Sequence, residues 1–298
     1  REIPNAQRDK YCVDKLITEL QHKFPKYGRV ANESMTDVSG ESVDISPVRA
    51  EAEKKVSGKQ IPELAVSHLA YCCEPNLMSQ AIEAQKQSQR SFIADLVANA
   101  IHFDREGFAI AQGSSSNMLA FQAFQGTSQY MMMGSVLPAI DRINVEHNID
   151  TDMFEALCRT SPIVPTDQRR LVANGLFLGW RRELAQAVYI LAPLLENIIR
   201  RMLTKAKVLT VTYDSNGVAS QVGLGALLKQ EECKTVLGSE LTEELKAIFT
   251  EPSAYNFRNK VAHGLLGEKE CQNFMGLHAW WIILRMLVDS VREELPVN

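Results

Sequence analysis

The sequence predicts an all-α protein, with an N-terminal helical domain over residues 1–159 and a helical bundle over residues 160–298 that carries one short β-hairpin. Three observations lead to this prediction. Apolar residues recur three and four positions apart through most of the chain. Only Val208–Val222 alternates like a pair of strands, around the turn signal Asn216-Gly217. Two prolines in Thr160–Thr166 interrupt the helical pattern and mark the expected domain boundary.

In the N-terminal region, the apolar spacing predicts one helix over Asp9–Phe24 and a second, long helix over Asn76–His102. The polar segment Gly28–Gly40 is expected to form a loop between them. Gly107–Gly134 mixes glycine, serine and glutamine and contains three consecutive methionines, Met131–Met133. We expect these methionines to pack in the core, although they would also suit an adaptable partner surface.

In the C-terminal region, Thr166 has a side chain suited to cap a helix that ends at Trp180. A second helix, Glu183–Lys205, is expected to kink at Pro193 because proline removes a helical hydrogen bond. Shorter helices and a closing core helix complete the expected bundle: Leu224–Gln230, Leu241–Phe249, Arg258–His263 and Cys271–Glu294.

The stretch Ser253–Leu266 (SAYNFRNKVAHGLL) contains residue types that can cleave a phosphodiester without a metal. Arg258 offers a planar fork of donors that fits phosphate oxygens, and histidine, here His263, is the residue type that exchanges protons near neutral pH. On a helix, Asn259 and His263 share a face, and Arg258 is long enough to reach it. The three side chains are therefore expected to meet one ligand.

The chain contains an internal control, Arg142 and His147, which are separated by the same spacing. Such a pair arises easily by chance, so the sequence context must decide which copy is functional. The first copy has Ile143 where the later copy has asparagine, and Glu146 precedes its histidine. We therefore expect Arg142 and His147 to be solvated residues at the end of a helix.

Arg258–His263 resembles the R-N-x-x-x-H signature of the HEPN superfamily, the higher eukaryotes and prokaryotes nucleotide-binding domains. The resemblance covers about residues 160–295, and residues before 160 resemble no family. Other segments resemble, in order, an uncharacterised bacterial family with a C-terminal HEPN-like domain: Ser161–Pro165, Gly175–Trp180, Leu191–Asn197, Arg258–Leu266 and Trp280-Trp281.

The resemblance implies a helical bundle that dimerises so that two motifs face one cleft and cleave RNA by 2′-hydroxyl attack without a metal. Arg258 would bind the phosphate, Asn259 would orient the site, and His263 would act as acid or base. Glu196 corresponds to an acidic residue of the facing helix, although it could instead pair with Arg200 one turn later. Many relatives serve in bacterial toxin, antiphage or stress systems. Others have lost nuclease activity and bind a nucleotide, an RNA or a protein partner.

Several of these residues also have a purely structural interpretation. His263 could interact with the dipole at a helix C-terminus, and Arg258 could pair with Glu251. His278 is expected to be a core or interface histidine. Three basic pairs are expected to be solvated instead of guiding RNA: Arg169-Arg170, Arg181-Arg182 and Arg200-Arg201.

Composition narrows the function further. The chain has 298 residues, 45% hydrophobic and 23% charged, which is ordinary for a globular protein. A formal net charge of -4 argues against nonspecific coating of nucleic acid, so RNA contact should be local. Neither zinc-ligand spacing nor a glycine-rich phosphate loop occurs, so no metal or cofactor is expected. Charges such as Arg285 break the apolar runs and no signal peptide is seen, so we expect a cytoplasmic protein without a membrane span. The first residue is Arg1 instead of Met, which suggests a fragment.

Three partners are expected: RNA, a second copy of the chain, and a protein partner of the N-terminal domain. One Arg-Asn-His set supplies one acid or base, whereas 2′-hydroxyl cleavage needs both, so we expect a homodimer through the C-terminal bundle. Trp280 and Trp281 point in different directions on a helix, so one of them is expected at the dimer seam.

Overall fold

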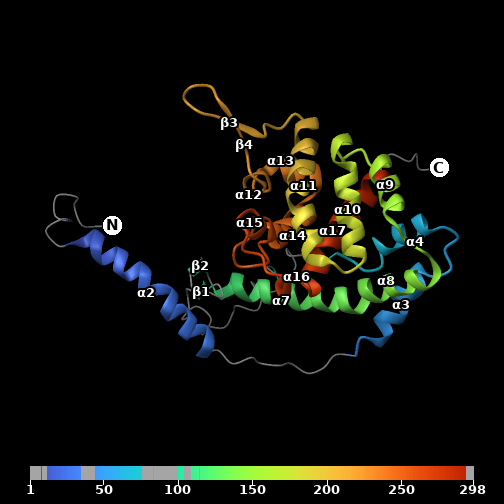
Figure 1. Cartoon of the computed structure of the whole chain (residues 1–298), viewed down its shortest axis with the longest axis horizontal. Coiled ribbons are helices and arrows are strands. Elements are labelled where there is room, and N and C mark those ends of the chain that lie inside the picture. Colours follow the sequence, from blue (N-terminus) through green and yellow to red (C-terminus); the bar gives the residue numbers. More distant parts are fainter. Residues whose placement is uncertain are drawn as a thin grey trace. The chain divides into compact units, whose positions relative to one another are not determined.

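The computed structural model confirms that the chain is mostly α-helical (Figure 1). It divides into two compact units, one formed by residues 1–42 and 86–119 and the other by residues 43–85 and 120–298. The residues that the structure describes are 8, 12–34, 44–75, 83, 100–103, 109–113 and 115–292.

The first unit contains a long helix, α2 (Val13–Ser34), and a two-stranded antiparallel sheet of β1 (Ala100–Phe103) and β2 (Ala109–Gly113). Two expectations are wrong here. The segment Gly28–Gly40, expected to form a loop, is helical as far as Ser34, because the apolar spacing of α2 continues to Val30. Residues 35–40 lie outside the described part of the chain. The helix expected over Asn76–His102 is contradicted at its end, because Ala100–His102 belong to the strand β1, which pairs with β2. Apart from residue 83, which is helical, residues 76–99 lie outside the described part of the chain.

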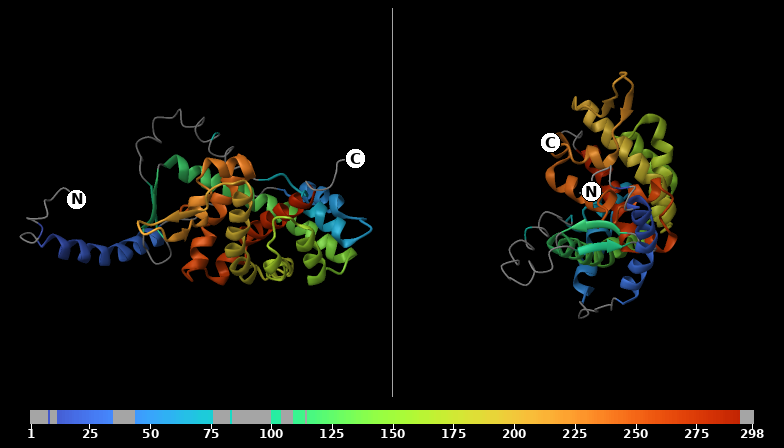
Figure 2. Two further views of the ribbon diagram at one scale, coloured as in Figure 1. Left: turned by 90° about the horizontal axis from the view of Figure 1, so that it is seen from above. Right: turned by 90° about the vertical axis from the view of Figure 1, so that its left-hand side faces the viewer.

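The second unit is a helical bundle around α17 (Phe274–Arg292), which is buried along most of its length (Figure 2). The helices α10 (Arg169–Trp180) and α11 (Leu184–Lys205) pack against α17 and each other. Further helices of this unit are α3 (Ser46–Val56), α4 (Pro62–Leu69), α7 (Ser115–Met131, mostly in this unit), α8 (Leu137–Glu146), α9 (Thr151–Thr160), α12 (Leu224–Leu227), α13 (Glu231–Leu237), α14 (Ser239–Phe249), α15 (Phe257–Ala262) and α16 (Glu268–Cys271).

Both tryptophans of α17 are buried, so the expectation that one lies at a dimer seam is wrong. Trp280 donates its indole N–H to the carbonyl of Leu176 at 2.9 Å, and Trp281 donates to the carbonyl of Leu69 at 3.1 Å. Because helices surround α17, neighbouring residues that face different directions can both be buried. Gly179 makes room for Trp280, since a Cβ at this position would overlap the indole ring.

The division between the two units does not coincide with the boundary expected at residue 160. Leu69 contacts α17 through the Trp281 hydrogen bond, and the hydroxyl groups of Ser161 and Ser290 bond at 2.7 Å. The helices of residues 44–70 and 120–160 therefore bury their apolar residues against the C-terminal helices. Thr166 begins a 3₁₀ turn, Thr166–Gln168, and its side chain caps no helix. The prolines before it mark a turn within one compact unit.

The hairpin expected near Asn216-Gly217 is present, formed by β3 (Val211–Tyr213) and β4 (Ala219–Gln221). A side-chain oxygen of Asp214 accepts hydrogen bonds from the backbone N–H groups of residues 216 and 218, at 2.8 and 2.9 Å. Gly217 has φ +78°, which glycine adopts without strain. The hairpin is largely exposed and extends away from the helices of its unit (Figure 2).

The methionine run and the long helices of this unit bear on three further expectations. Met131 and Met132 are buried, as the core interpretation requires, whereas Met133 is 42% exposed. α11 continues through Pro193 as a single helix of 22 residues, and the kink expected at this residue stays a prediction. Among the described residues, α17 alone is long and apolar enough to cross a membrane, yet most of it is buried inside the protein, as in a core helix.

Candidate functional site

The Arg-Asn-His motif lies on α15, a short helix held at both ends by residues with a left-handed backbone. Asn256 precedes the helix with φ +56°, and Gly264 follows it with φ +67°. The N–H of Leu265 bonds the carbonyl of Lys260 at 2.8 Å, which closes the C-terminal end. Phe257 is fully buried and anchors the helix in the core. These local features fix the position of the motif against α11.

Glu196 of α11 joins Arg258 to a second arginine. Arg258 Nε donates to Glu196 Oε2 at 2.7 Å, and Arg200 Nη2 donates to Glu196 Oε1 at 2.8 Å. The pairing with Arg200 that the helical spacing suggested is therefore present, and Glu196 also faces Arg258 of the motif helix. Arg258 does not pair with Glu251, whose carboxylate accepts from the Ser253 hydroxyl at 2.8 Å.

Asn259 extends this network along α15. Its side-chain oxygen accepts from Arg258 Nη1 at 3.3 Å, and its side-chain nitrogen donates to Asn256 at 2.7 Å. Arg258 thus reaches around the helix towards the face of Asn259, as the sequence suggested. The structure brings together Arg258, Asn259 and Glu196 among the four expected site residues.

His263 lies at the end of the same helix but outside this hydrogen-bonded network. Its backbone N–H bonds the carbonyl of Asn259 at 3.1 Å, and its side chain is exposed. Four residues along a helix correspond to about 6 Å, so His263 lies about one turn from Asn259. This position suits an acid or base that meets a substrate at the surface. It equally suits the alternative of a histidine at a helix C-terminus.

The charge of the network favours an anion. One carboxylate lies between two guanidinium groups, which leaves a net charge of about +1 on Arg200, Glu196 and Arg258. The three side chains are between 14% and 29% exposed, so solvent screens them only partly. Arg200 is therefore not the solvated surface residue that the sequence suggested. Its recognisable signal was the four-residue spacing from Glu196, which alone indicates only a helix ion pair.

The residues on either side of the β3–β4 hairpin lie next to the network of Arg200, Glu196 and Arg258. Arg200 Nη1 donates to the carbonyl of Thr210, which precedes β3, at 3.1 Å. Gly223, just after β4, lies beside Arg258, since a Cβ at this position would be 3.8 Å from Arg258 Nη2. Glu196 is thus linked through Arg200 to the residue before β3, and its other partner, Arg258, lies close to Gly223 after β4.

Two hollows lie along α11, and the smaller one is lined by residues of the motif helix. The smaller, of about 160 Å³, is lined by Pro193, Glu196, Arg258, Val261 and Ala262. The larger, of about 530 Å³, is lined by Ala185, Gln186, Tyr189, Ile190 and Glu268. The smaller hollow is below the usual size of a small-molecule site, which is about 300 Å³ or more. A phosphate group or the surface of a macromolecule fits this place better than a whole nucleotide.

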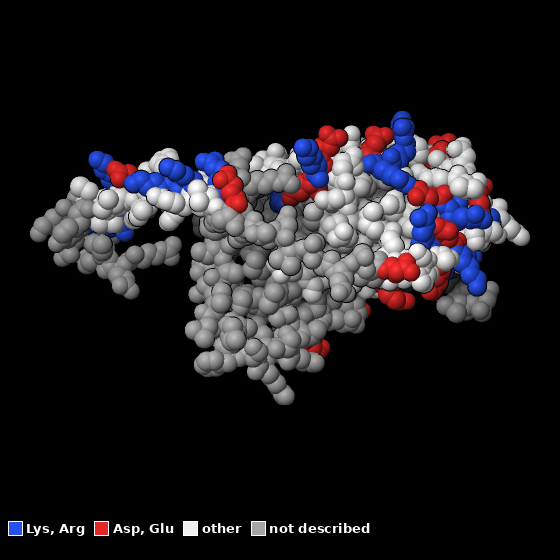
Figure 3. Space-filling model, turned by 90° about the horizontal axis from the view of Figure 1, so that it is seen from below, with Lys and Arg blue, Asp and Glu red and all other residues white. Residues whose placement is uncertain are grey.

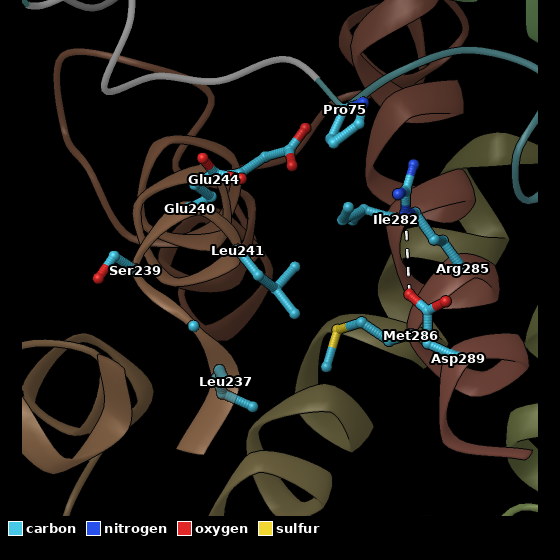
Figure 4. Close-up of a pocket in the computed structure, with 11 residues that line it drawn as sticks. Pro75, Leu237, Ser239, Glu240, Leu241, Glu244, Ile282, Arg285, Met286 and Asp289 are labelled. Carbon is cyan, nitrogen blue, oxygen red and sulfur yellow. Dashed lines mark ion pairs between the residues drawn. The ribbon is translucent and has the colours of Figure 1, made fainter. Parts of the chain in front are cut away.

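A separate cleft of about 360 Å³ lies between the start of α14 and α17 (Figure 4). Its charged lining residues are Glu240, Glu244, Arg285 and Asp289. Three carboxylates face one guanidinium, so this cleft repels phosphate. Behind it, His278 is fully buried and its Nε2 lies 2.9 Å from Glu244 Oε1, which confirms the core interpretation of this histidine.

Surface charge elsewhere is mixed. On the face shown in Figure 3, Lys and Arg side chains lie among Asp and Glu side chains, without a continuous basic surface over the coloured residues. Arg181 and Arg182 pair with Glu183 and Asp141, and are more than half exposed, as expected.

The control pair behaves differently from the motif. Arg142 pairs with Glu146 of its own helix and is 43% exposed, as expected. His147 is only half-exposed, and its Nε2 is buried without a hydrogen-bond partner in the described part of the chain, so the expectation of a solvated histidine is wrong. His147 follows the last residue of α8, where the chain turns into an extended conformation. Neither residue joins a network like that of Glu196.

Metal ligands do not gather in the described residues, which contain no group of three or more His, Cys, Asp or Glu side chains suited to an ion. The six cysteines are free. Burial raises the pKa of the Cys158 thiol to about 12 and that of Cys271 to about 11, so these thiols stay protonated at neutral pH. Neither is an activated nucleophile.

No family model, no curated protein and no solved structure matches this chain. The resemblance to HEPN domains therefore stays a prediction that rests on the residues quoted above.

Proposed function

We propose that this protein is a metal-independent endoribonuclease of the HEPN type, which acts as a homodimer in the cytoplasm of a bacterium as part of a toxin, antiphage or stress system. One observation carries the proposal. The Glu196 carboxylate fixes Arg258 beside a surface hollow in a network of net positive charge, and the exposed His263 ends the same short helix. A fixed cation and an accessible proton carrier are what phosphodiester cleavage requires.

In the proposed reaction, the 2′-hydroxyl oxygen of RNA attacks the adjacent phosphorus and the bond to the 5′-oxygen breaks. His263 removes the 2′-hydroxyl proton, or it gives a proton to the departing 5′-oxygen. Arg258 stabilises the charge that builds on the phosphorane oxygens. The products are a 2′,3′-cyclic phosphate and a free 5′-hydroxyl. Since one His263 fills one of the two proton-transfer roles, a second copy supplies the other.

The second candidate is a silent module that binds a nucleotide, an RNA or a protein partner through the same surface. One observation favours it. In the free protein Arg258 already donates to two internal acceptors, Glu196 and Asn259, as a purely structural arginine would. Binding through the remaining N–H groups needs no catalysis, so the two candidates must be separated by turnover.

The test measures cleavage of a labelled RNA in EDTA, with DNA of the same sequence as the control substrate. The wild type should cleave RNA and leave DNA intact, because DNA lacks the attacking hydroxyl. His263→Ala should abolish cleavage, and Arg258→Ala should slow it by about 100- to 1,000-fold, the usual effect of losing one charge-stabilising donor. Arg142→Ala is the matched control, an arginine of equal spacing outside the network, and should stay within a few-fold of wild type.

Two results would reject the proposed mechanism. The first is intact RNA at every protein concentration together with RNA binding that Arg258→Ala weakens, which supports the silent module. The second is cleavage that persists in His263→Ala, which assigns the activity to other residues or to a contaminant. Identification of a 2′,3′-cyclic phosphate by mass spectrometry would separate this reaction from metal-dependent hydrolysis, which leaves a linear phosphate.

A further inference from the structure

Helix α2 (Val13–Ser34) presents a row of large apolar side chains to solvent. Their exposed fractions run from 39% to 64%, far above those of the core: Leu16, Ile17, Leu20, Phe24, Tyr27 and Val30. Gly28 is the one buried residue between residues 13 and 30, although β1 and β2 approach this helix within their unit. A contiguous apolar surface of this kind marks an interaction site. We call these six residues the apolar stripe.

The spacing within α2 indicates what kind of surface covers the stripe. Val13, Ile17, Leu20, Phe24 and Tyr27 are separated by four, three, four and three residues. This alternation is the heptad pattern, in which apolar residues form a seam that faces another helix.

The charges of α2 argue against a membrane surface. The helix carries four basic and three acidic side chains, so its polar face lacks the cationic excess that draws a helix to anionic lipid. Acidic and basic residues alternate there, as Lys15, Glu19 and Lys26 illustrate. Mixed charges are typical of the solvated outer face of a coiled coil.

We infer that α2 is a dimerisation helix whose apolar stripe packs against α2 of a second copy of this chain. A two-fold pair is self-complementary, because each stripe covers the same stripe of its partner. With roughly 170 Å² for each large apolar side chain, the six residues expose roughly 500 Å² on each copy. The pair would therefore bury about 1,000 Å², the size at which specific interfaces begin.

This inference goes beyond the proposed nuclease and does not depend on it, since a silent module would pair in the same way. Its consequence for the motif is a high local concentration. Once two chains are joined through α2, contact between their C-terminal bundles is an intramolecular event. Even a weak interface between the two bundles would then be occupied.

The test is the dimer dissociation constant of the full chain, measured by analytical ultracentrifugation from nanomolar to tens of micromolar protein. The variant Leu20→Glu/Phe24→Glu places two charges in the centre of the stripe. The matched variant Thr18→Glu/His22→Glu adds the same two acidic residues to the opposite face of the same helix. Circular dichroism checks that both variants keep the helix content of the wild type.

We expect a wild-type dimer, a stripe variant whose dissociation constant rises by about 100-fold or more, and a control variant within about threefold of wild type. Loss of two central anchors typically weakens an interface by at least this factor. A monomeric wild type at tens of micromolar would overturn the inference. So would a stripe variant that dimerises like wild type, because the dimer would then rest on the C-terminal bundle alone. Cosedimentation of a monomeric wild type with phosphatidylserine vesicles, lost in the stripe variant, would assign the face to a membrane instead.

Discussion

Replacing Glu196 by glutamine tests whether one carboxylate organises the candidate site. The substitution keeps the shape of the side chain but removes the charge between Arg258 and Arg200, whose nitrogens lie 2.7 and 2.8 Å from its oxygens. The oxygen of the glutamine amide can accept a hydrogen bond from only one of the two guanidinium groups. The NH2 group of the amide, which is a donor, then faces the N–H groups of the other guanidinium. Two positive charges then face each other without a counter-charge, so the folded state loses stability.

The expected loss follows from the burial of the three side chains. Removing one partner of a fully buried ion pair costs about 3–5 kcal/mol, whereas an exposed pair contributes about 0–1 kcal/mol. Glu196, Arg258 and Arg200 are 16%, 29% and 14% exposed and lie between these limits. We therefore expect the free energy of unfolding to fall by about 2 kcal/mol, which corresponds to a melting temperature lower by about 4–8 °C.

Tryptophan fluorescence in urea measures this loss directly. The three tryptophans of the chain, Trp180, Trp280 and Trp281, are buried in the second unit, so their emission reports its unfolding. Glu155→Gln is the matched control, because Glu155 pairs at the same helical spacing with Arg159, which is 58% exposed, and the change should cost less than about 0.5 kcal/mol. A Glu196→Gln protein within 0.5 kcal/mol of wild type would refute the reasoning. A double-mutant cycle with Arg258→Ala should show a coupling of about 1 kcal/mol.

Further predictions concern packing, thiols and pH. Gly179→Ala should lower the free energy of unfolding by about 1–3 kcal/mol, because the added Cβ overlaps the Trp280 ring. Gly126→Ala should raise it by about 0.5–1 kcal/mol, because the added Cβ meets no atom within 4 Å and alanine favours a helix. Equal effects of the two substitutions on unfolding in urea would contradict this prediction. In native protein at pH 8, the thiols of Cys158 and Cys271 should react with Ellman's reagent only after unfolding, and rapid reaction of all six thiols would show that these two are accessible. Because their pKa values are raised on folding, to about 12 and about 11, the stability they contribute is complete below the unfolded value of about 8.5. It should fall as the pH rises towards those folded values, and a urea midpoint that stays constant from pH 8 to 10.5 would contradict this.

Sequence periodicity predicted the helices of the second unit after residue 165, and little of the first unit. Helices α10 and α11 match the expected segments to within a few residues, because their apolar residues repeat at helical spacing on one face. β1 was missed because its strand is defined by pairing with β2, which local spacing does not reveal. Trp280 and Trp281 of α17 were expected to face different surroundings, one of them a dimer seam. A sequence does not show how many other helices pack around a given helix.

The candidate site could be predicted in its residues but not in its geometry. Arg258 and Asn259 are neighbours in the chain, so their proximity follows from the motif. The ion pair between Arg258 and Glu196 joins residues 62 positions apart and depends on how α11 and α15 pack. The link from Arg200 to the carbonyl of Thr210 involves a backbone atom, which no residue pattern marks. Tertiary packing therefore supplies the connection between the motif and the hairpin.

Replacing Glu196 by glutamine also distinguishes the two candidate functions, through RNA binding and RNA cleavage. Glu196 competes with a phosphate for the N–H groups of Arg258, so its loss should raise the net charge of the network from about +1 to about +2. RNA should then bind Glu196→Gln more tightly, with a salt dependence steeper by up to about one unit of log K against log salt. A nuclease that needs Arg258 in one fixed orientation should nevertheless cleave more slowly in this variant. Tighter binding of the RNA substrate does not stabilise the transition state when Arg258 is no longer held in place. A silent module should show the tighter binding and no turnover in either protein.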